Sequence, residues 1–339
     1  MTFKLGLTAD FLNAKGEIGW GDIGLAMLDQ SPAISWEFLA DCGSELPPEV
    51  ADDYDALLVL TPRVTAGTVA RPKKRLRLVA RFGVGYDNVD VGACTKAGVA
   101  LTITPDGVRR PVAVGAIALI LAATHNVVVK DRLTREGRWA QKLAYMGTGI
   151  TGKTLGIVGL GNTGRELVVA SQSLGMTYQA YDPYADEGAA ASLGVPLIDL
   201  PTLMQTSDVV CIMAALTEET RHLIGARELA AMKGSAYLVN IGRGGIVDEA
   251  ALIAALSEGR IRGAALDVFE EEPPDPGNPL LRMENVVLAP HAICWTDEIA
   301  LGNGRSALQA VVDVAAGRRP SNVVNPEVFA QMDASARLR

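Results

Sequence analysis

An arginine, a histidine and several acidic side chains occur in three short segments that each end a predicted strand. The segments are 239–245 with Arg243, 266–273 with Asp267 and Glu272, and 289–291 with His291. A guanidinium can bind a carboxylate through two parallel hydrogen bonds and polarise a neighbouring carbonyl. An imidazole can deliver or accept a hydroxyl proton, and a carboxylate behind the imidazole fixes its tautomer. Redox chemistry on a 2-hydroxy or 2-keto acid requires groups of these kinds.

These segments belong to a half of the chain in which apolar runs alternate with helix-like stretches. We predict strands at 156–160, 177–181, 208–213, 236–241, 262–267 and 286–288, and helices near 164–174, 185–193, 201–206, 226–233 and 248–258. This alternation is typical of a parallel sheet with crossover helices. Ligands of such sheets bind at the carboxyl ends of the strands, where the three segments lie.

A glycine-rich turn follows the first of these strands. Gly159, Gly161 and Gly164 have G-x-G-x-x-G spacing at the start of a helix, and Asp182 ends the next strand. The glycines permit a tight turn, the close approach of a pyrophosphate and close helix–strand packing, and the carboxylate accepts ribose hydroxyls. Since no basic residue adjoins Asp182, the pattern predicts a site for NAD rather than NADP.

The N-terminal third repeats the alternation without a glycine fingerprint. Predicted strands lie near 3–8, 56–60, 78–82 and 99–103, and predicted helices near 22–29 and 90–97. A long apolar helix is expected from about Pro111 to Glu136, and another at 298–316 returns the chain to the first domain. We therefore expect an α/β protein with two doubly wound parallel-sheet, Rossmann-like domains and an interdomain cleft. Residues 1–106 and 291–339 would form the substrate-binding (catalytic) domain, and 107–290 the NAD-binding domain.

Composition narrows the function classes. The 339 residues suit about two domains, and 49% hydrophobic with 21% charged residues fits a packed globular protein. A net charge of −8 argues against nucleic acid and anionic membranes as partners. Cys42, Cys94, Cys211 and Cys294 lack metal-site spacing and fit reduced, cytoplasmic thiols. The start of the chain does not resemble a signal peptide, and the apolar run 112–123 is shorter than the roughly 20 residues that cross a bilayer.

Several motifs in order resemble those of the D-isomer-specific 2-hydroxyacid dehydrogenase family, over nearly the whole chain. They are Arg81-Phe-Gly-Val-Gly-Tyr-Asp-Asn-Val-Asp90, Thr151-Gly-Lys-Thr-Leu-Gly-Ile-Val-Gly-Leu-Gly161 and the three segments that contain Arg243, Glu272 and His291. That family includes phosphoglycerate, glyoxylate/hydroxypyruvate and D-lactate dehydrogenases. The resemblance implies an NAD-dependent oxidoreductase that interconverts a small D-2-hydroxy acid and its 2-keto acid, and relatives are commonly homodimers.

The resemblance also implies roles for individual residues. Arg243 would bind the substrate carboxylate and carbonyl, His291 would be the acid–base group and Glu272 its partner. The backbone amides around Val84 and Gly85 would hold the substrate carboxylate. The implied cofactor residues are Gly159, Gly161, Asn162, Thr163, Gly164, Asp182, Thr217 and Asp267, the last at the nicotinamide carboxamide. Asp267 could instead merely cap the end of its strand.

Departures from the family pattern leave alternatives open. The segment 106–114 has Arg109 and Arg110 where a neutral and an acidic residue are common, and Val114 replaces the usual glutamate. It is either a solvated charged loop or a second anion site for substrate or cofactor. Trp295 either forms an apolar wall for the substrate side chain or packs at an interface.

Several other polar residues are not expected to take part in the chemistry. We expect His125, within the long helix, and His222 to be structural, and Glu270 and Glu271 to be solvated. Cys294 is expected to be a packed free thiol, because hydride transfer needs no nucleophile.

A different class of function remains open from the sequence. The chain also resembles the C-terminal-binding-protein corepressors, in which an NAD-sensing scaffold retains the dehydrogenase site. It lacks the long disordered extensions that would recruit partners. Turnover of NADH with a panel of 2-keto acids separates the two classes.

Overall fold

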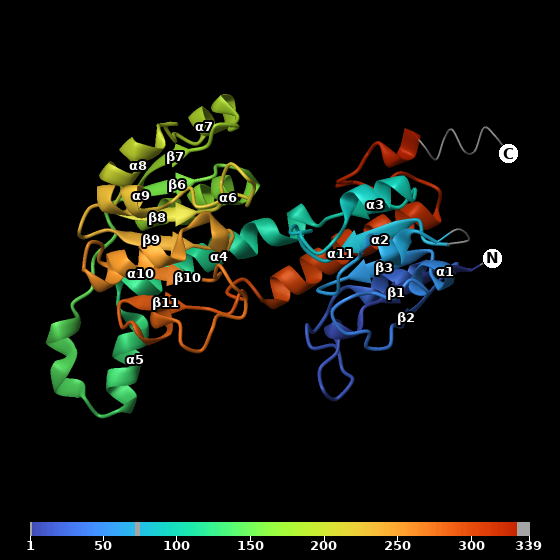
Figure 1. Ribbon diagram of the computed structural model, residues 1–339, viewed down its shortest axis with the longest axis horizontal. Helices are drawn as coiled ribbons and strands as arrows, with labels where there is room; N and C mark the ends of the chain where they lie inside the picture. Colours follow the sequence, from blue (N-terminus) through green and yellow to red (C-terminus); the bar gives the residue numbers. More distant parts are fainter. Residues whose placement is uncertain (1, 72–74, 331–339) are drawn as a thin grey trace. The chain divides into compact units, whose positions relative to one another are not determined.

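The chain divides into two compact units in the computed structural model, which describes residues 2–71 and 75–330. The first unit comprises 1–108 and 295–339, and the second comprises 109–294. Each has a parallel sheet covered by helices on both faces (Figure 1). The expected fold class, two doubly wound α/β units, is therefore confirmed. The chain leaves the second unit after Cys294, so His291 lies in that unit and not in the first.

The second unit contains a six-stranded parallel sheet in the order β11-β10-β9-β8-β6-β7. Its strands are β6 (Thr154–Val158), β7 (Thr177–Tyr181), β8 (Val209–Ile212), β9 (Tyr237–Asn240), β10 (Gly263–Leu266) and β11 (Val286–Leu288). A parallel bridge from Ala180 to Leu197 adds a short outer pairing beside β7. Strands β6 and β8 are hydrogen-bonded to each other, and from this pair the chain builds the sheet outward in opposite directions. Doubly wound sheets bind dinucleotides at such a reversal of strand order.

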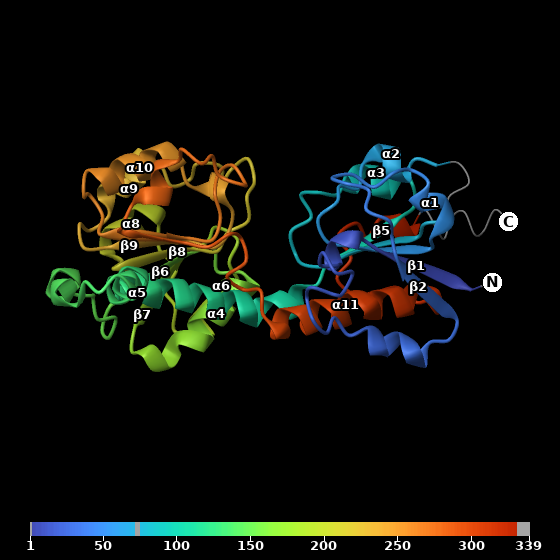
Figure 2. The same cartoon turned by 90° about the horizontal axis from the view of Figure 1, so that it is seen from below.

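Helices bury both faces of this sheet, which explains why its central strands read as unbroken apolar runs (Figure 2). One face packs against α8 (Leu200–Thr206), α9 (Ala226–Ala231) and α10 (Glu249–Ser257). The other packs against α4 (Pro105–Thr124), α6 (Asn162–Ser171) and α7 (Glu187–Ser192). Successive strand residues alternate between the two cores: Val209 and Cys211 join one, Val210 and Ile212 the other.

The first unit has a five-stranded parallel sheet in the order β2-β1-β3-β4-β5. Its strands are β1 (Phe3–Leu7), β2 (Ile34–Phe38), β3 (Ala56–Val59), β4 (Leu78–Arg81) and β5 (Ala100–Thr102), and its helices are α1 (Val50–Asp53), α2 (Ala66–Val69), α3 (Val91–Lys96) and α11 (Asp297–Ala315). The short edge strand β2 was not predicted, because its side chains are mostly exposed and give no apolar run. The apolar face of α11 covers one side of this sheet, as expected for the C-terminal helix.

The expected single helix from Pro111 to Glu136 is wrong. Helix α4 begins at Pro105 and ends at Thr124, and α5 (Val127–Arg135) follows after Asn126, which has the left-handed φ of 53°. Pro111 is accommodated inside α4 as its seventh residue. His125 therefore lies at the break between the helices, where its Nδ1 is 3.1 Å from Thr124 Oγ1.

Helix α4 is long and apolar enough to cross a bilayer by length and composition, since it extends beyond the apolar run seen in the sequence. About half of its apolar window (56%) is buried inside the protein, however. Ala113, Ala116 and Ile120 are buried in one core of the second unit. A helix in the core of a folded domain can be equally long and apolar, so burial in this core accounts for the apolar composition of α4.

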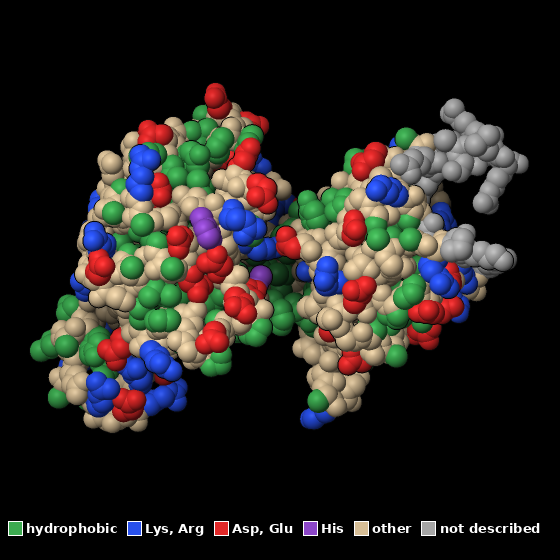
Figure 3. Space-filling view, in the orientation of Figure 1, with side chains coloured by type: hydrophobic (Ala, Val, Ile, Leu, Met, Phe, Trp, Pro, Cys, Tyr) green, Lys and Arg blue, Asp and Glu red, His purple; other side chains and the backbone are tan. Residues whose placement is uncertain are grey.

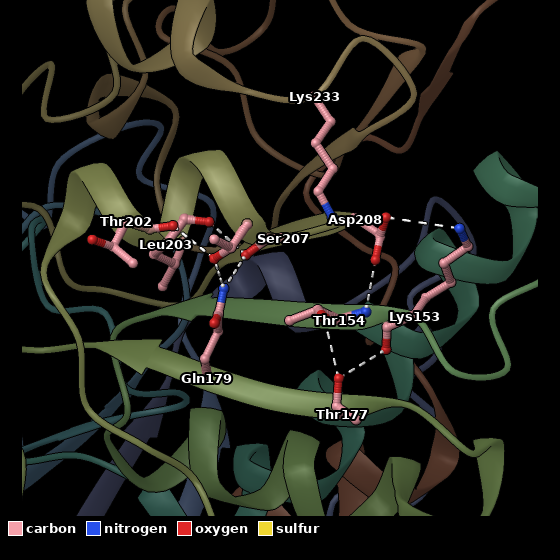
Figure 4. A network of polar contacts seen from close by, with 10 residues as sticks. Lys153, Thr154, Thr177, Gln179, Thr202, Leu203, Ser207, Asp208 and Lys233 are labelled. Atoms are coloured by element: carbon pink, nitrogen blue, oxygen red, sulfur yellow. Dashed lines mark hydrogen bonds and ion pairs between the residues drawn. The ribbon is translucent and has the colours of Figure 1, made fainter.

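At the amino-terminal ends of the strands in the six-stranded sheet, an acidic residue interacts with two lysines. Asp208 accepts a hydrogen bond from the Thr154 amide at 2.9 Å and one from Lys233 at 3.1 Å, and Lys153 Nζ lies 3.8 Å away (Figure 4). Burial raises the pKa of Asp208, but these hydrogen bonds and charges outweigh burial and lower it overall. This network joins the starts of β6 and β8.

Candidate active site in the second unit

The glycine turn after β6 has the features that a bound pyrophosphate requires. Gly159 has φ 97°, and a Cβ there would lie 2.7 Å from the Ala214 backbone; a Cβ on Gly164 would lie 2.3 Å from the Gly159 carbonyl oxygen. At Gly161 nothing lies within 4 Å of a Cβ, so its surface is open. Asn162 and Thr163 then begin α6, whose first amides face an approaching anion. The turn therefore fits the pyrophosphate of NAD.

Asp182 lies against this turn at the end of β7. Its Oδ2 accepts a hydrogen bond from the Leu160 amide at 2.8 Å, and its Oδ1 accepts one from the Tyr184 amide at 2.9 Å. Both oxygens keep further lone pairs for ribose hydroxyls. A carboxylate held here also repels a 2′-phosphate, which favours NAD over NADP.

Two other expected cofactor residues make local contacts. The amide of Thr217 donates to Thr220 Oγ1 at 2.7 Å, which closes the turn after β8. Asn162 Oδ1 accepts from Arg165 Nη2 at 2.7 Å, one turn along α6. Their roles toward the cofactor stay predictions.

His291 and Glu272 form an imidazole–carboxylate pair. The distance from His291 Nδ1 to Glu272 Oε2 is 2.7 Å, and because an ionised carboxylate only accepts, Nδ1 is the donor. Nε2 is then the nitrogen left to act on a substrate. Burial raises the pKa of Glu272, but the bonds from His291 and the Phe269 amide, with the charge of Arg243, lower it below its ordinary value. Glu272 thus remains a carboxylate at neutral pH.

Asp267 anchors the backbone on which His291 stands. It is 2% exposed, and its Oδ1 accepts from the amides of Ala292 at 2.9 Å and Ile293 at 3.0 Å. Its carbonyl accepts from the His291 amide at 2.7 Å, and His291 has the left-handed φ of 54°. Burial raises the pKa of Asp267 despite these two amides, which lower it. Asp267 therefore holds the His291 turn, a role that the sequence did not reveal.

Arg243 lies between β9 and the segment that contains Glu272. Its Nη1 donates to the Gly242 carbonyl at 2.8 Å, and its charge reaches Glu272 strongly enough to lower the pKa of that carboxyl. The buried Asn240 fixes the backbone here, since Nδ2 donates to the Arg243 carbonyl and Oδ1 accepts from the Gly242 amide. Asn240 was not predicted; a buried amide at a strand end is the signal that could have identified it.

The segment 106–114 was expected to be either a solvated charged loop or a second anion site, and it is not a loop. Residues 105–124 are helical, and Arg110 Nη1 forms an ion pair with Glu166 Oε1 on α6 at 2.9 Å. Arg109 lies one residue earlier on α4. Val114 is exposed on the same helix. A role of Arg109 in binding substrate or cofactor stays a prediction.

The expected carboxylate loop of the first unit follows β4. The Gly83 carbonyl accepts from the Thr104 amide at 3.0 Å, Arg81 donates to the Phe82 carbonyl, and Val84 is exposed. The rings of Trp295 and Trp20 pack in a tilted arrangement with centroids 4.3 Å apart, and Trp20 meets Phe82 edge to face at 5.2 Å. Trp295 is nevertheless 55% exposed. It is therefore packed within its own unit and still offers apolar surface.

Of the residues expected to have no chemical role, one agrees with that expectation and one has a specific partner. Cys294 is a free thiol whose pKa burial raises to about 11, so it is not a thiolate. Glu270, however, is not simply solvated: its Oε1 accepts from His222 Nε2 at 2.6 Å. Across residues 2–71 and 75–330, no group of three or more His, Cys, Asp or Glu side chains could hold a metal ion.

Comparison with known proteins agrees with this geometry. Residues 117–292 match the family model described as "D-isomer specific 2-hydroxyacid dehydrogenase, NAD binding domain". A glyoxylate reductase of Korarchaeum cryptofilum is 40% identical over 296 residues, which cover 86% of this chain and 89% of that protein. A D-3-phosphoglycerate dehydrogenase of Archaeoglobus fulgidus is 40% identical over 80% of this chain, but the chain spans about half (51%) of its length.

Solved structures show the same likeness in three dimensions. The TT0316 protein of Thermus thermophilus has a TM-score of 0.82 at 29% identity, with 95% of this chain and all of that chain covered. A glyoxylate reductase of Paecilomyes thermophila has a TM-score of 0.80 at 29% identity, with 96% and 99% covered. The chain therefore belongs to the D-isomer specific 2-hydroxyacid dehydrogenases, a family of NAD-dependent oxidoreductases, and its second unit is the NAD-binding domain.

Proposed function

We propose that this protein interconverts a small D-2-hydroxy acid and the corresponding 2-keto acid. The pairing of His291 Nδ1 with Glu272 Oε2, beside the charge of Arg243 in the NAD-binding unit, supports the proposal most strongly. An imidazole held in one tautomer by a carboxylate is suited to move a proton at a hydroxyl or carbonyl oxygen.

The residues divide the work by their chemistry. NAD(H), when bound, accepts or supplies the hydride. In reduction, protonated His291 delivers its Nε2 proton to the keto oxygen, and the Glu272 carboxylate stabilises the imidazolium beforehand. Arg243 binds the substrate carboxylate and stabilises the negative charge that develops on the keto oxygen. Asp267 keeps the His291 turn in place, and its role at the nicotinamide carboxamide is part of the proposal.

In this proposal the first unit is the substrate-binding unit, in which the amides around Val84 and Gly85 hold the substrate carboxylate. Trp295 offers an apolar surface beside the substrate side chain, and Arg109 accepts a second anionic group where the substrate has one. A small anionic acid is thus the partner, with no part for nucleic acid, membrane or metal.

We further propose that the chain forms a homodimer in the cytoplasm through its NAD-binding unit. Apolar side chains are exposed over α5 and the 3-10 helix Trp139–Tyr145, beside charged ones (Figure 3). The exposed set comprises Val127, Val128, Trp139, Leu143 and Met146. Apolar patches of this kind on a soluble domain mark contact surfaces. Sedimentation that gives the mass of a single chain at micromolar concentration would contradict the dimer.

A panel of 2-keto acids tests the function. Glyoxylate, hydroxypyruvate, phosphohydroxypyruvate and longer sugar-derived keto acids are each reduced with NADH and with NADPH as hydride donors. We expect turnover with at least one keto acid and a preference for NADH. NADH binding without turnover of any of them would instead favour the scaffold alternative.

A further inference from the structure

The NAD-binding unit contains a second imidazole–carboxylate pair, whose carboxylate lies on the same segment as Glu272. His222 Nε2 donates to Glu270 Oε1 at 2.6 Å. The backbone of His222 is fixed, because its amide donates to the Gly245 carbonyl at 2.9 Å and the Ile224 amide donates to the Ile246 carbonyl at 3.1 Å. Residues 222–224 and 244–249 thus form one platform, directly after Arg243.

The segment 267–272 is clamped onto this platform. The Glu270 amide donates to Glu249 Oε2 at 3.0 Å, and the Glu249 amide donates to Glu270 Oε2 at 3.4 Å. Asn278 Nδ2 donates to Glu249 Oε1 at 2.6 Å, so the carboxylate of Glu249 is itself held. A Cβ on Gly244 would lie 1.8 Å from the Phe269 carbonyl oxygen, which shows how closely the two backbones pack.

The same segment sets the position of Glu272. Glu272 Oε1 accepts from the Phe269 amide at 3.1 Å, while its Oε2 accepts from His291. Glu270, which is held on the platform, is therefore two residues before Glu272 and directly follows Phe269, whose amide donates to Glu272. Figure 3 shows histidine, acidic and basic side chains gathered on this face of the unit.

We propose that His222, acting through Glu270, and Glu249 are positioning residues that hold Glu272 against His291. The inference rests on the proposed role of Glu272 as the partner of His291. Glu249, Glu270, Glu271 and Glu272 bring several negative charges together, and a donor on Glu270 offsets their repulsion. Without it, the segment keeps only its contacts with Glu249 on the platform, and Glu272 is held less firmly in its direction toward His291.

The imidazole tautomer of His291 tests the inference without any substrate. The chain has three histidines, so nitrogen-15 labelling of histidine gives three ring systems to assign. In the parent protein we expect His291 protonated on Nδ1 in its neutral form. In His222→Ala we expect a mixture of both tautomers, whereas His222→Gln, which can still donate to Glu270, restores the parent spectrum. An unchanged His291 spectrum in His222→Ala would overturn the proposal.

Kinetics give a second readout. We expect His222→Ala to lower kcat about tenfold, part of the roughly 10²–10⁴-fold that acid–base catalysis supplies, with KM for the keto acid little changed. Glu270→Ala removes the acceptor of the His222 hydrogen bond and should act in the same direction. Arg260→Ala is the matched control, because it breaks an exposed pair at a similar distance, 2.6 Å to Glu258.

Equal losses in His222→Ala and the Arg260→Ala control would make His222 merely a surface residue and would contradict the inference. So would a double variant His222→Ala/Glu272→Gln whose loss is the product of the single losses, since residues acting on one bond are not additive. Failure of the parent to turn over any keto acid would instead contradict the proposed function, and the tautomer measurement would still decide the inference.

Discussion

The NAD-binding unit contains two imidazole–carboxylate pairs that look nearly alike. His291–Glu272 measures 2.7 Å and His222–Glu270 2.6 Å, their side chains are similarly exposed, and both histidines have left-handed φ, 54° and 51°. They differ in the nitrogen that is engaged: Nδ1 in His291 and Nε2 in His222. A histidine that donates through Nδ1 still has Nε2, the nitrogen farther from the backbone, available for a substrate. In His222 that nitrogen is already hydrogen-bonded to a carboxylate. The ring nitrogen that is engaged, and not the presence of a carboxylate partner alone, therefore distinguishes the predicted catalytic histidine.

The largest expected effect is the loss of His291. His291→Ala removes the proton donor, so we expect turnover to fall about 10³-fold or more, while NADH binding measured by fluorescence stays within twofold. His222→Ala in the same assay is the comparison. Similar losses in both variants would mean that the two pairs are not functionally different.

Arg243→Lys should have the next largest effect. An ammonium keeps the charge but cannot form the two parallel hydrogen bonds, so we expect kcat/KM to fall about 10²-fold. Arg260→Lys, on the exposed pair with Glu258, controls for the change of side chain. Full activity in Arg243→Lys would show that charge alone suffices at this position.

Glu272→Gln should change the pH profile as well as the rate. The amide can still accept from Nδ1, but the charge that stabilises the imidazolium is lost, so we expect kcat for reduction to fall about tenfold or more. Because reduction needs the protonated imidazole, its basic limb should move to lower pH. The lowered pKa of Glu272 keeps the parent pair charged down to the acid side of the ordinary glutamate range. A basic limb at the same pH in both proteins would contradict the pairing.

The smallest effect is expected at the opposite edge of the sheet, where Asp208→Asn should leave kcat unchanged. Hydrogen bonds to a charged group contribute about 1.5–3 kcal/mol, so the free energy of unfolding should fall by about that amount at neutral pH. Since the pKa of Asp208 is lowered in the folded state, its contribution is full above the ordinary value of 3.8 and is lost as pH falls through the folded value. Urea unfolding at pH 7 and pH 3 measures it; a difference that grows on acidification would contradict this assignment.

Sequence pattern predicted much of this molecule because parallel strands and glycine turns have local signatures. The strand β7 at 177–181 and the turn at Gly159–Gly164 lie where the spacing placed them. The break at Asn126 was not predicted, since a single left-handed residue between two apolar stretches gives no periodic signal. The edge strand β2 was missed although Ile34-Ser-Trp-Glu-Phe38 alternates apolar and polar residues, because it lacks the continuous apolar run of the buried strands.

The sequence by itself determined which chemical groups are present, that they follow strands, and that a dinucleotide turn precedes them. The family resemblance indicated Glu272 as the partner of His291, but only the tertiary structure decided that a neighbouring carboxylate meets His222. Glu270, Glu271 and Glu272 are adjacent and chemically equal, yet Glu270 contacts His222 and Glu272 contacts His291. It also decided that Asp267 holds the His291 turn. The physical reason is that such contacts join residues far apart in sequence. Which side chains meet depends on the direction of the chain as it leaves each strand.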